Sequence, residues 1–274
     1  SQSYQPFTGG AVYFNPGTNL NFKLGVTDLF EDYKITGGFR FSADFNANEF
    51  LLSFENLKYR VDRQIIYHRQ GIKDIITLDD EQFLYKTNSN ELYYILKYPL
   101  NQVMAAKLTG TIRHDKRSIL TVPLSISALE YPTENTFWTG LKTELVFDNT
   151  RSLGTNIYDG TRFKVFGEAY KKLVEPYEDL YVVGLDFRHY QVIHRNFIFA
   201  ARFAASSSFG KSRLIYYLGG VDNWQTFRGP PFIPLSEIPI DENTNYAFQT
   251  VATNMRGFYQ NIRNGNNFAL MNYE

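Results

Sequence analysis

The sequence predicts an all-β protein, a transmembrane antiparallel up-and-down β-barrel in which residues 1–274 form a single barrel domain. Three observations lead to this prediction. Apolar and polar residues alternate along most of the chain, the alternating segments are long for strands, and the connections between them are short and long in turn. Transmembrane barrels combine these three features.

The alternation is clearest between Thr18 and Phe30, where the even positions from Leu20 to Val26 are apolar and the odd positions are mostly polar. Successive side chains of a strand point to opposite faces, so such a segment has one apolar and one polar face. We expect the apolar faces to meet lipid and the polar faces to line the lumen. The residues expected to face lipid include Phe22, Phe39, Phe41, Leu141, Leu185, Phe197 and Phe199, and those expected to face the lumen include Lys23, Arg40, Lys142, Asp186 and Arg188.

Twelve segments are predicted as strands, most of them ~9 to 13 residues long, which is the length that a tilted strand needs to cross a bilayer. Strands of soluble proteins are nearer ~5 or 6 residues, so a β-sandwich is the weaker alternative. The predicted strands are 4–14, 18–30, 34–46, 48–60, 62–70, 84–99, 103–115, 136–149, 162–174, 179–193, 196–209 and 266–274.

The connections indicate the orientation, because barrels of this kind have short periplasmic turns and long outer loops. Short links are predicted near Glu31–Tyr33, Val61–Asp62, Asn101–Gln102, Arg151–Asn156 and His194–Asn196. Long links are predicted near Gly71–Gln82, Lys116–Glu134 and Lys211–Gly265, which would all lie on the outer side.

Composition argues against several functions. Lys plus Arg and Asp plus Glu both number 28, so the net charge is zero and a nucleic-acid partner is not expected. The chain has no cysteine, which excludes thiol catalysis and thiolate metal sites. Its four histidines lack metal-ligand spacing, and the serines at 206–208 do not form a nucleophile elbow. We therefore expect no enzymatic activity, no metal and no cofactor.

The long connection 211–265 carries the most specific motif. Gly219-Gly220 lies near its start and Met255-Arg256-Gly257-Phe258 near its end, followed by the predicted last strand. This order resembles the BamA/TamA superfamily of bacterial outer-membrane barrels, which includes the two-partner secretion transporters. The succession of strands and links typical of these barrels extends over the whole chain, whereas the residues of the specific motif lie between Leu218 and Glu274.

The resemblance implies that the chain holds about 12 of an expected 16 strands, is incomplete at its C-terminus, and folds the outer loop 211–265 into the lumen. It also implies that Arg256 pairs with lumen carboxylates, a task that suits the planar, permanently charged guanidinium. The family's partners would lie beyond Glu274, and Glu144, Glu168 and Asp186 are the candidate partners within this chain. The alternative is that Arg256 is a solvated loop charge.

The function expected from this resemblance is non-covalent insertion, assembly or translocation of proteins at the bacterial outer membrane. The expected partners are outer-membrane lipid and client outer-membrane or secreted proteins, with periplasmic or lipoprotein partners as further candidates. Two alternatives remain open: a passive channel or solute transporter, and a barrel that anchors a surface or periplasmic module.

Overall fold

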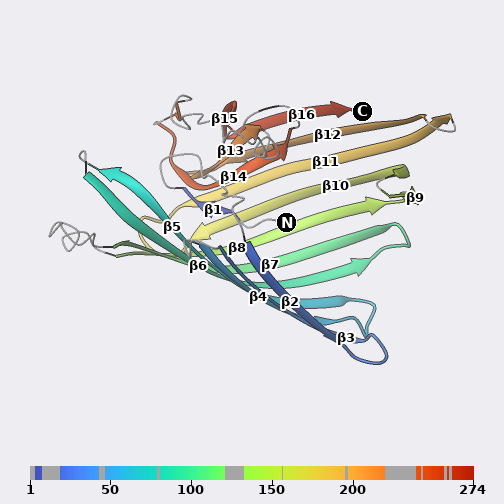
Figure 1. Ribbon diagram of the computed structural model, residues 1–274, viewed down its shortest axis with the longest axis horizontal. Coiled ribbons are helices and arrows are strands. Elements are labelled where there is room, and N and C mark those ends of the chain that lie inside the picture. The colour runs from blue at the N-terminus through green and yellow to red at the C-terminus, as the bar shows by residue number, and fades with distance from the viewer. Residues whose placement is uncertain are drawn as a thin grey trace.

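A computed structural model describes residues 4–7, 19–42, 47–78, 81–120, 133–155, 157–194, 197–219, 239–241, 243–255, 258 and 261–274. These residues form two β-sheets, one large and one small (Figure 1). Among them, no helix is long and apolar enough to cross a membrane.

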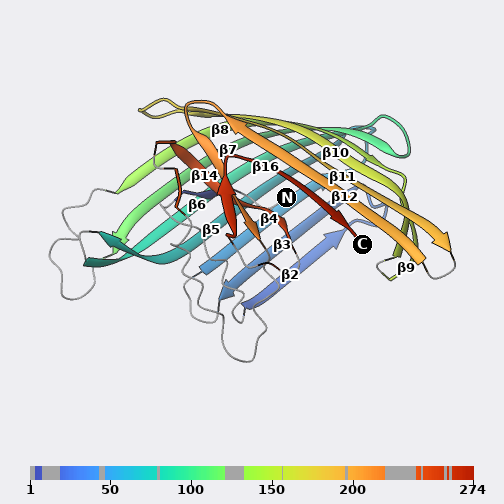
Figure 2. The ribbon, with the colours of Figure 1, turned by 90° about the horizontal axis from the view of Figure 1, so that it is seen from above.

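The large sheet, here called the wall, has 12 strands that pair antiparallel with their neighbours. It curves around one concave face (Figure 2). Its order runs from β2 at one edge to β16 at the other, and β9 pairs only with β10. The edge strands β2 and β16 are not paired to each other, so the described wall is open. Its strands are β2 (Asn19–Thr27), β3 (Tyr33–Ser42), β4 (Ala47–Asn56), β5 (Asp62–Leu78), β6 (Glu81–Pro99), β7 (Met104–Leu120), β8 (Glu134–Asp148), β9 (Arg151–Gly154), β10 (Ile157–Lys172), β11 (Asp179–His194), β12 (Phe197–Phe209) and β16 (Asn267–Tyr273).

The small sheet, here called the inner sheet, lies against the concave face of the wall (Figures 1 and 2). It has four strands in the order β1 (Gln5–Pro6), β14 (Tyr246–Asn254), β13 (Arg213–Gly219) and β15 (Arg263–Gly265). β13 and β14 are parallel, and the other two pairs are antiparallel. The inner sheet therefore joins the start of the chain to the segment between β12 and β16.

The predicted all-β, antiparallel architecture is confirmed, and the two faces of the wall have the predicted character. Large apolar side chains such as Phe22, Leu141 and Phe197 are exposed on the convex face, with exposed fractions of 60%, 51% and 61%. Polar residues at alternating positions, among them Thr109, Thr111 and Arg113 on β7, are buried on the concave face. The wall is thus apolar outside and polar inside.

One predicted long link is wrong, and a second contains strands. The long link predicted near Gly71–Gln82 is largely strand, because β5 continues to Leu78 and β6 begins at Glu81. The extension contains Ile72, Ile75 and Ile76, and β-branched residues favour strands. The connection 211–265 also contains regular structure, since β13, β14 and β15 lie within it.

The predicted first strand, 4–14, also differs from the prediction. Its described part is only Gln5–Pro6, which pairs with β14 in the inner sheet rather than with the wall; residues 8–14 lie outside the described residues. Counted from β2 along the described path of the wall, β12 is the tenth strand and β16 the eleventh, not the eleventh and twelfth. Aromatic contacts hold the segment in the inner sheet, since Tyr4 lies beside Phe248 and Phe7 beside Tyr246.

Candidate functional site

The candidate functional site is the interface between the concave face of the wall and the inner sheet. Its apolar core joins Trp138, Leu180 and Val182 of the wall to Leu214, Tyr216 and Phe248 of the inner sheet, and all six side chains are buried. The rings of Trp138 and Phe248 are 5.1 Å apart. Burial of aromatic and aliphatic surface is the main stabilising contribution to such a contact.

Wall serines bind β13 of the inner sheet. Ser208 Oγ accepts a hydrogen bond from the Leu214 backbone nitrogen at 3.0 Å and donates one to the Leu214 carbonyl at 2.9 Å. Ser206 Oγ lies 2.7 Å from the Tyr216 hydroxyl. Burial raises the pKa of Tyr216, so its phenol stays protonated at neutral pH. β13 is therefore anchored through both its backbone and its side chains.

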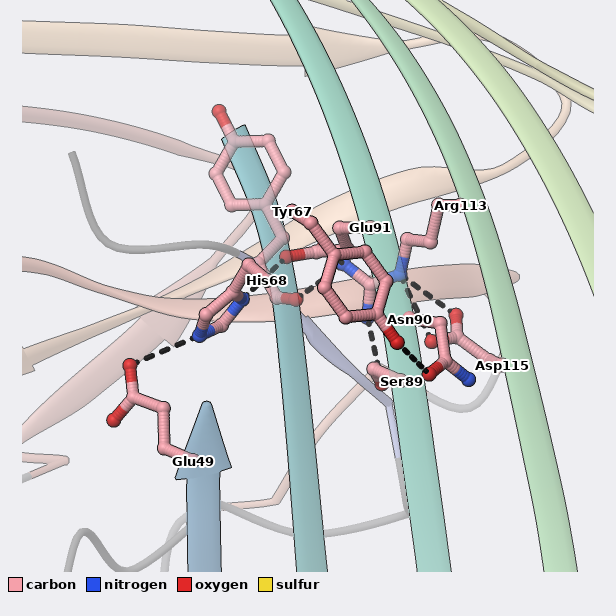
Figure 3. A network of polar contacts seen from close by, with 9 residues as sticks. Glu49, Tyr67, His68, Ser89, Asn90, Glu91, Arg113 and Asp115 are labelled. Atoms are coloured by element: carbon pink, nitrogen blue, oxygen red, sulfur yellow. Dashed lines mark hydrogen bonds and ion pairs between the residues drawn. The ribbon is translucent and has the colours of Figure 1, made fainter. Parts of the chain in front are cut away.

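A charged network crosses four wall strands beneath the inner sheet (Figure 3). Arg113 on β7 contacts Glu91 at 2.7 Å and Asp115 at 2.8 Å, and these three side chains are at most 6% exposed. His68 on β5 lies between two carboxylates, with Nδ1 2.9 Å from Glu91 and Nε2 2.9 Å from Glu49. Both ring nitrogens face acceptors, and a doubly protonated imidazolium satisfies both contacts.

The network also reaches the inner sheet. The Arg113 guanidinium lies 4.5 Å from the centroid of the Phe248 ring, which is a cation–π arrangement. Phe248 therefore contacts both Trp138 and Arg113, so the apolar core and the charged network meet at one residue.

The three predicted lumen carboxylates all have basic neighbours on the wall. Glu168 lies 2.7 Å from Lys142, and Asp186 lies 2.8 Å from Arg202. Glu144 has three lysines between 3.6 and 3.9 Å away, namely Lys107, Lys142 and Lys164. Arg202 also donates to Thr253 Oγ1 of β14 at 3.1 Å. These carboxylates thus belong to the charged concave face.

The predicted loop motif is described only in part. Arg256, Gly257 and Gly220 lie outside the described residues, so pairing of Arg256 with a lumen carboxylate stays a prediction. Gly219 ends β13 with a positive φ of 146°, and its carbonyl accepts a hydrogen bond from the Met255 nitrogen at 3.1 Å. Phe258 is 48% exposed. Gly219, in the first part of the motif, and Met255, in the second part, are therefore adjacent.

Sequence reasoning did not single out Glu49, Glu91, Arg113 or Asp115. A signal for two of them was present, because Arg113 and Asp115 are two positions apart and share a face of β7. Their pairing with Glu91 depends on the strand register, which places Glu91 opposite Arg113. Within the described part of the chain, no group of three or more His, Cys, Asp or Glu residues is placed to hold a metal ion.

The chain matches no protein-family model and no curated protein sequence. Among solved structures, it is similar to CdiB from Acinetobacter baumannii, with a TM-score of 0.48 and 12% sequence identity. The similar region covers 74% of this chain and 38% of that protein, so the chain spans less than half of its length.

Proposed function

We propose that this chain forms part of the wall and the lumen plug of a bacterial outer-membrane barrel that inserts or translocates proteins without covalent chemistry. One observation carries the proposal. The segment between β12 and β16 returns onto the concave face and is held there by the Phe248 core and by wall serines. A connection that only capped a barrel would not need a buried interface with the wall.

The two faces of the wall support the membrane part of the proposal. A lipid bilayer requires apolar side chains outside and backbone groups paired between strands. The convex face carries many large exposed apolar residues, and most wall strands exceed the ~9 to 11 residues needed to cross a bilayer. A water-soluble protein rarely exposes so large an apolar surface.

The loop motif supports the proposed relation to the BamA/TamA superfamily. The hydrogen bond between Gly219 and Met255 brings together the two parts of the motif, which are far apart in the sequence. We expect Arg256 to pair in the lumen, so Arg256→Ala should cost about 3–5 kcal/mol of barrel stability if that pair is desolvated. Arg263→Ala, at an exposed inner-sheet arginine, is the matched control and should change little. If both substitutions change barrel stability equally little, Arg256 is a solvated loop charge.

The proposed partners are outer-membrane lipid, client outer-membrane or secreted proteins, and periplasmic or lipoprotein assembly partners; no enzymatic activity is proposed. A passive channel or solute transporter is the second candidate. The observation that favours it is the concave face, which carries both signs of charge, as a water-filled lumen would. The docked inner sheet favours the first candidate, because it covers part of that face.

The two candidates are separated by reconstituting the full-length protein in liposomes and measuring client insertion and single-channel conductance together. We expect insertion of an unfolded outer-membrane client to accelerate, with low conductance while the inner sheet is docked. A steady open-pore conductance without client insertion would support the channel. If neither client insertion nor conductance is observed, the anchor alternative remains.

A further inference from the structure

Residues 4–7, here called the strap, form an added strand on the edge of β14. The Phe7 nitrogen donates to the Ala247 carbonyl at 3.1 Å, and Gln5 and Pro6 lie opposite Gln249 and Phe248. Bonded and non-bonded pairs alternate in an antiparallel ladder, which places Pro6 at a pair that needs no backbone N–H. The strap is therefore bound as an extended peptide would be bound at a sheet edge.

Three side chains bind the strap by its backbone carbonyls. Arg113 Nη1 donates to the Tyr4 carbonyl at 2.5 Å, and Arg117 Nη2 donates to the Phe7 carbonyl at 2.9 Å. Gln249 Nε2 donates to the Pro6 carbonyl at 3.1 Å. Because every peptide has these carbonyls, the contacts do not depend on the sequence of the strap.

The side chains of the strap fit the site unequally. Tyr4 lies 6.1 Å from the Tyr170 ring and 6.3 Å from the Phe248 ring, and Phe7 lies 5.3 Å from the Tyr246 ring. Between them, Gln5 Oε1 is buried without a hydrogen-bond partner in the described structure, as is Arg117 Nε. An unsatisfied buried polar atom costs free energy. The site therefore favours aromatic residues at both ends and is poorly matched to the glutamine between them.

We propose that β14, Arg113 and Arg117 form a binding site for an extended polypeptide with aromatic residues three positions apart, and that the strap is its exchangeable internal occupant. The inference rests on the proposed function in one respect: the segment that competes with the strap would come from a client in the lumen. A client segment that displaced the strap would gain the same backbone contacts and remove one anchor of the inner sheet.

Residues 1–274 contain no cysteine, so a disulfide between two introduced cysteines can lock the strap without competition from this part of the protein. Phe7 and Ala247 form a hydrogen-bonded antiparallel pair, with Cα atoms expected about 5.5 Å apart, a separation that a disulfide can bridge. The full-length Phe7→Cys/Ala247→Cys protein is prepared in detergent in reduced and oxidised forms. The probe is a fluorescent synthetic peptide with the sequence of residues 1–10, and its binding is followed by anisotropy.

We expect the reduced protein to bind the peptide and the oxidised protein to bind it at least about tenfold more weakly. Replacing both aromatic residues of the peptide by alanine should also weaken binding about tenfold, whereas replacing its Gln-Pro pair by Ser-Ala should change it less than about threefold. The Phe7→Cys variant alone, treated with the same oxidant, is the control and should bind like the reduced protein.

Equal binding by the reduced and oxidised forms would place the peptide elsewhere, and no binding by either form would show that the strap does not exchange; both results would overturn the proposal. If the first pair fails to fold, Gln5→Cys/Gln249→Cys is the second lock and must give the same contrast. Since no client is inserted in this assay, its failure is distinguishable from failure of the proposed function.

Discussion

Arg113 lies between two carboxylates and an aromatic ring, with a side chain only 6% exposed. Two acidic groups this close together out of water are tolerated because the guanidinium is shared between them. Its position also joins three parts of the molecule, namely the wall, the strap and β14. A substitution of Arg113 therefore tests how much the charge pairs of the concave face stabilise the folded protein.

Arg113→Ala should destabilise the folded protein by about 3–5 kcal/mol, because it leaves Asp115 buried without its cation and leaves Glu91 with His68 alone. The matched control is Arg40→Ala, which removes an ion pair to Glu49 whose arginine side chain is 50% exposed. An exposed pair of this kind contributes about 0–1 kcal/mol. Urea unfolding of both variants in the same lipid checks the contrast, and similar losses would contradict the account.

The convex face makes a second prediction for single residues. Leu141 is in mid-strand and Leu29 is in the turn between β2 and β3, and both are exposed. Leu141→Arg should cost about 2–4 kcal/mol if it lies near the bilayer midplane, whereas Leu29→Arg, at the water side, should cost about 0–1 kcal/mol. Unfolding from lipid vesicles measures both. Equal tolerance would argue against lipid around the convex face.

Among the elements, alternating segments were predictable and the inner sheet was not. β8, β11 and β12 agree with their predicted ranges to within a few residues, because one apolar and one polar face produce a period of two. β13 reads Arg-Leu-Ile-Tyr-Tyr-Leu-Gly, a continuous apolar run typical of a strand buried on both faces. Such a run has no alternation, and the parallel pairing of β13 with β14 depends on contacts that local sequence does not encode.

Phe248 of the inner sheet is 2% exposed and contacts both Trp138 and Arg113 of the wall. Phe248→Ala should cost about 3–5 kcal/mol of docking and stability, since it leaves a cavity beside Trp138 and Arg113. Trypsin cleavage after Arg213 should then become faster while the wall stays folded. Phe187→Ala, at an exposed phenylalanine of the wall, is the control and should leave the cleavage rate unchanged. Unchanged cleavage in both variants would contradict the role given to Phe248.

At the scale of the whole molecule, the wall separates an apolar exterior from a charged interior that holds the inner sheet. The apolar exterior was predictable from the sequence, because each strand repeats the same alternation. The charged residues of the interior were predictable from the same alternation, but their pairing was not. Its pairs join residues of different strands, such as His68 with Glu49 and Glu91, and these pairs depend on a register that a single sequence does not specify.

Lipid contact at neighbouring positions of the wall shows directly whether the wall spans a membrane. Single cysteines replace Phe22, Lys23, Leu141 or Lys142 in the full-length protein, each is labelled with bimane, and quenching by brominated lipid is measured in vesicles. The account predicts strong quenching at Phe22 and Leu141, which are exposed on the convex face, and weak quenching at the two lysines. Equal quenching within each pair, or no quenching at any position, would contradict a membrane-spanning wall with a sheltered, charged interior.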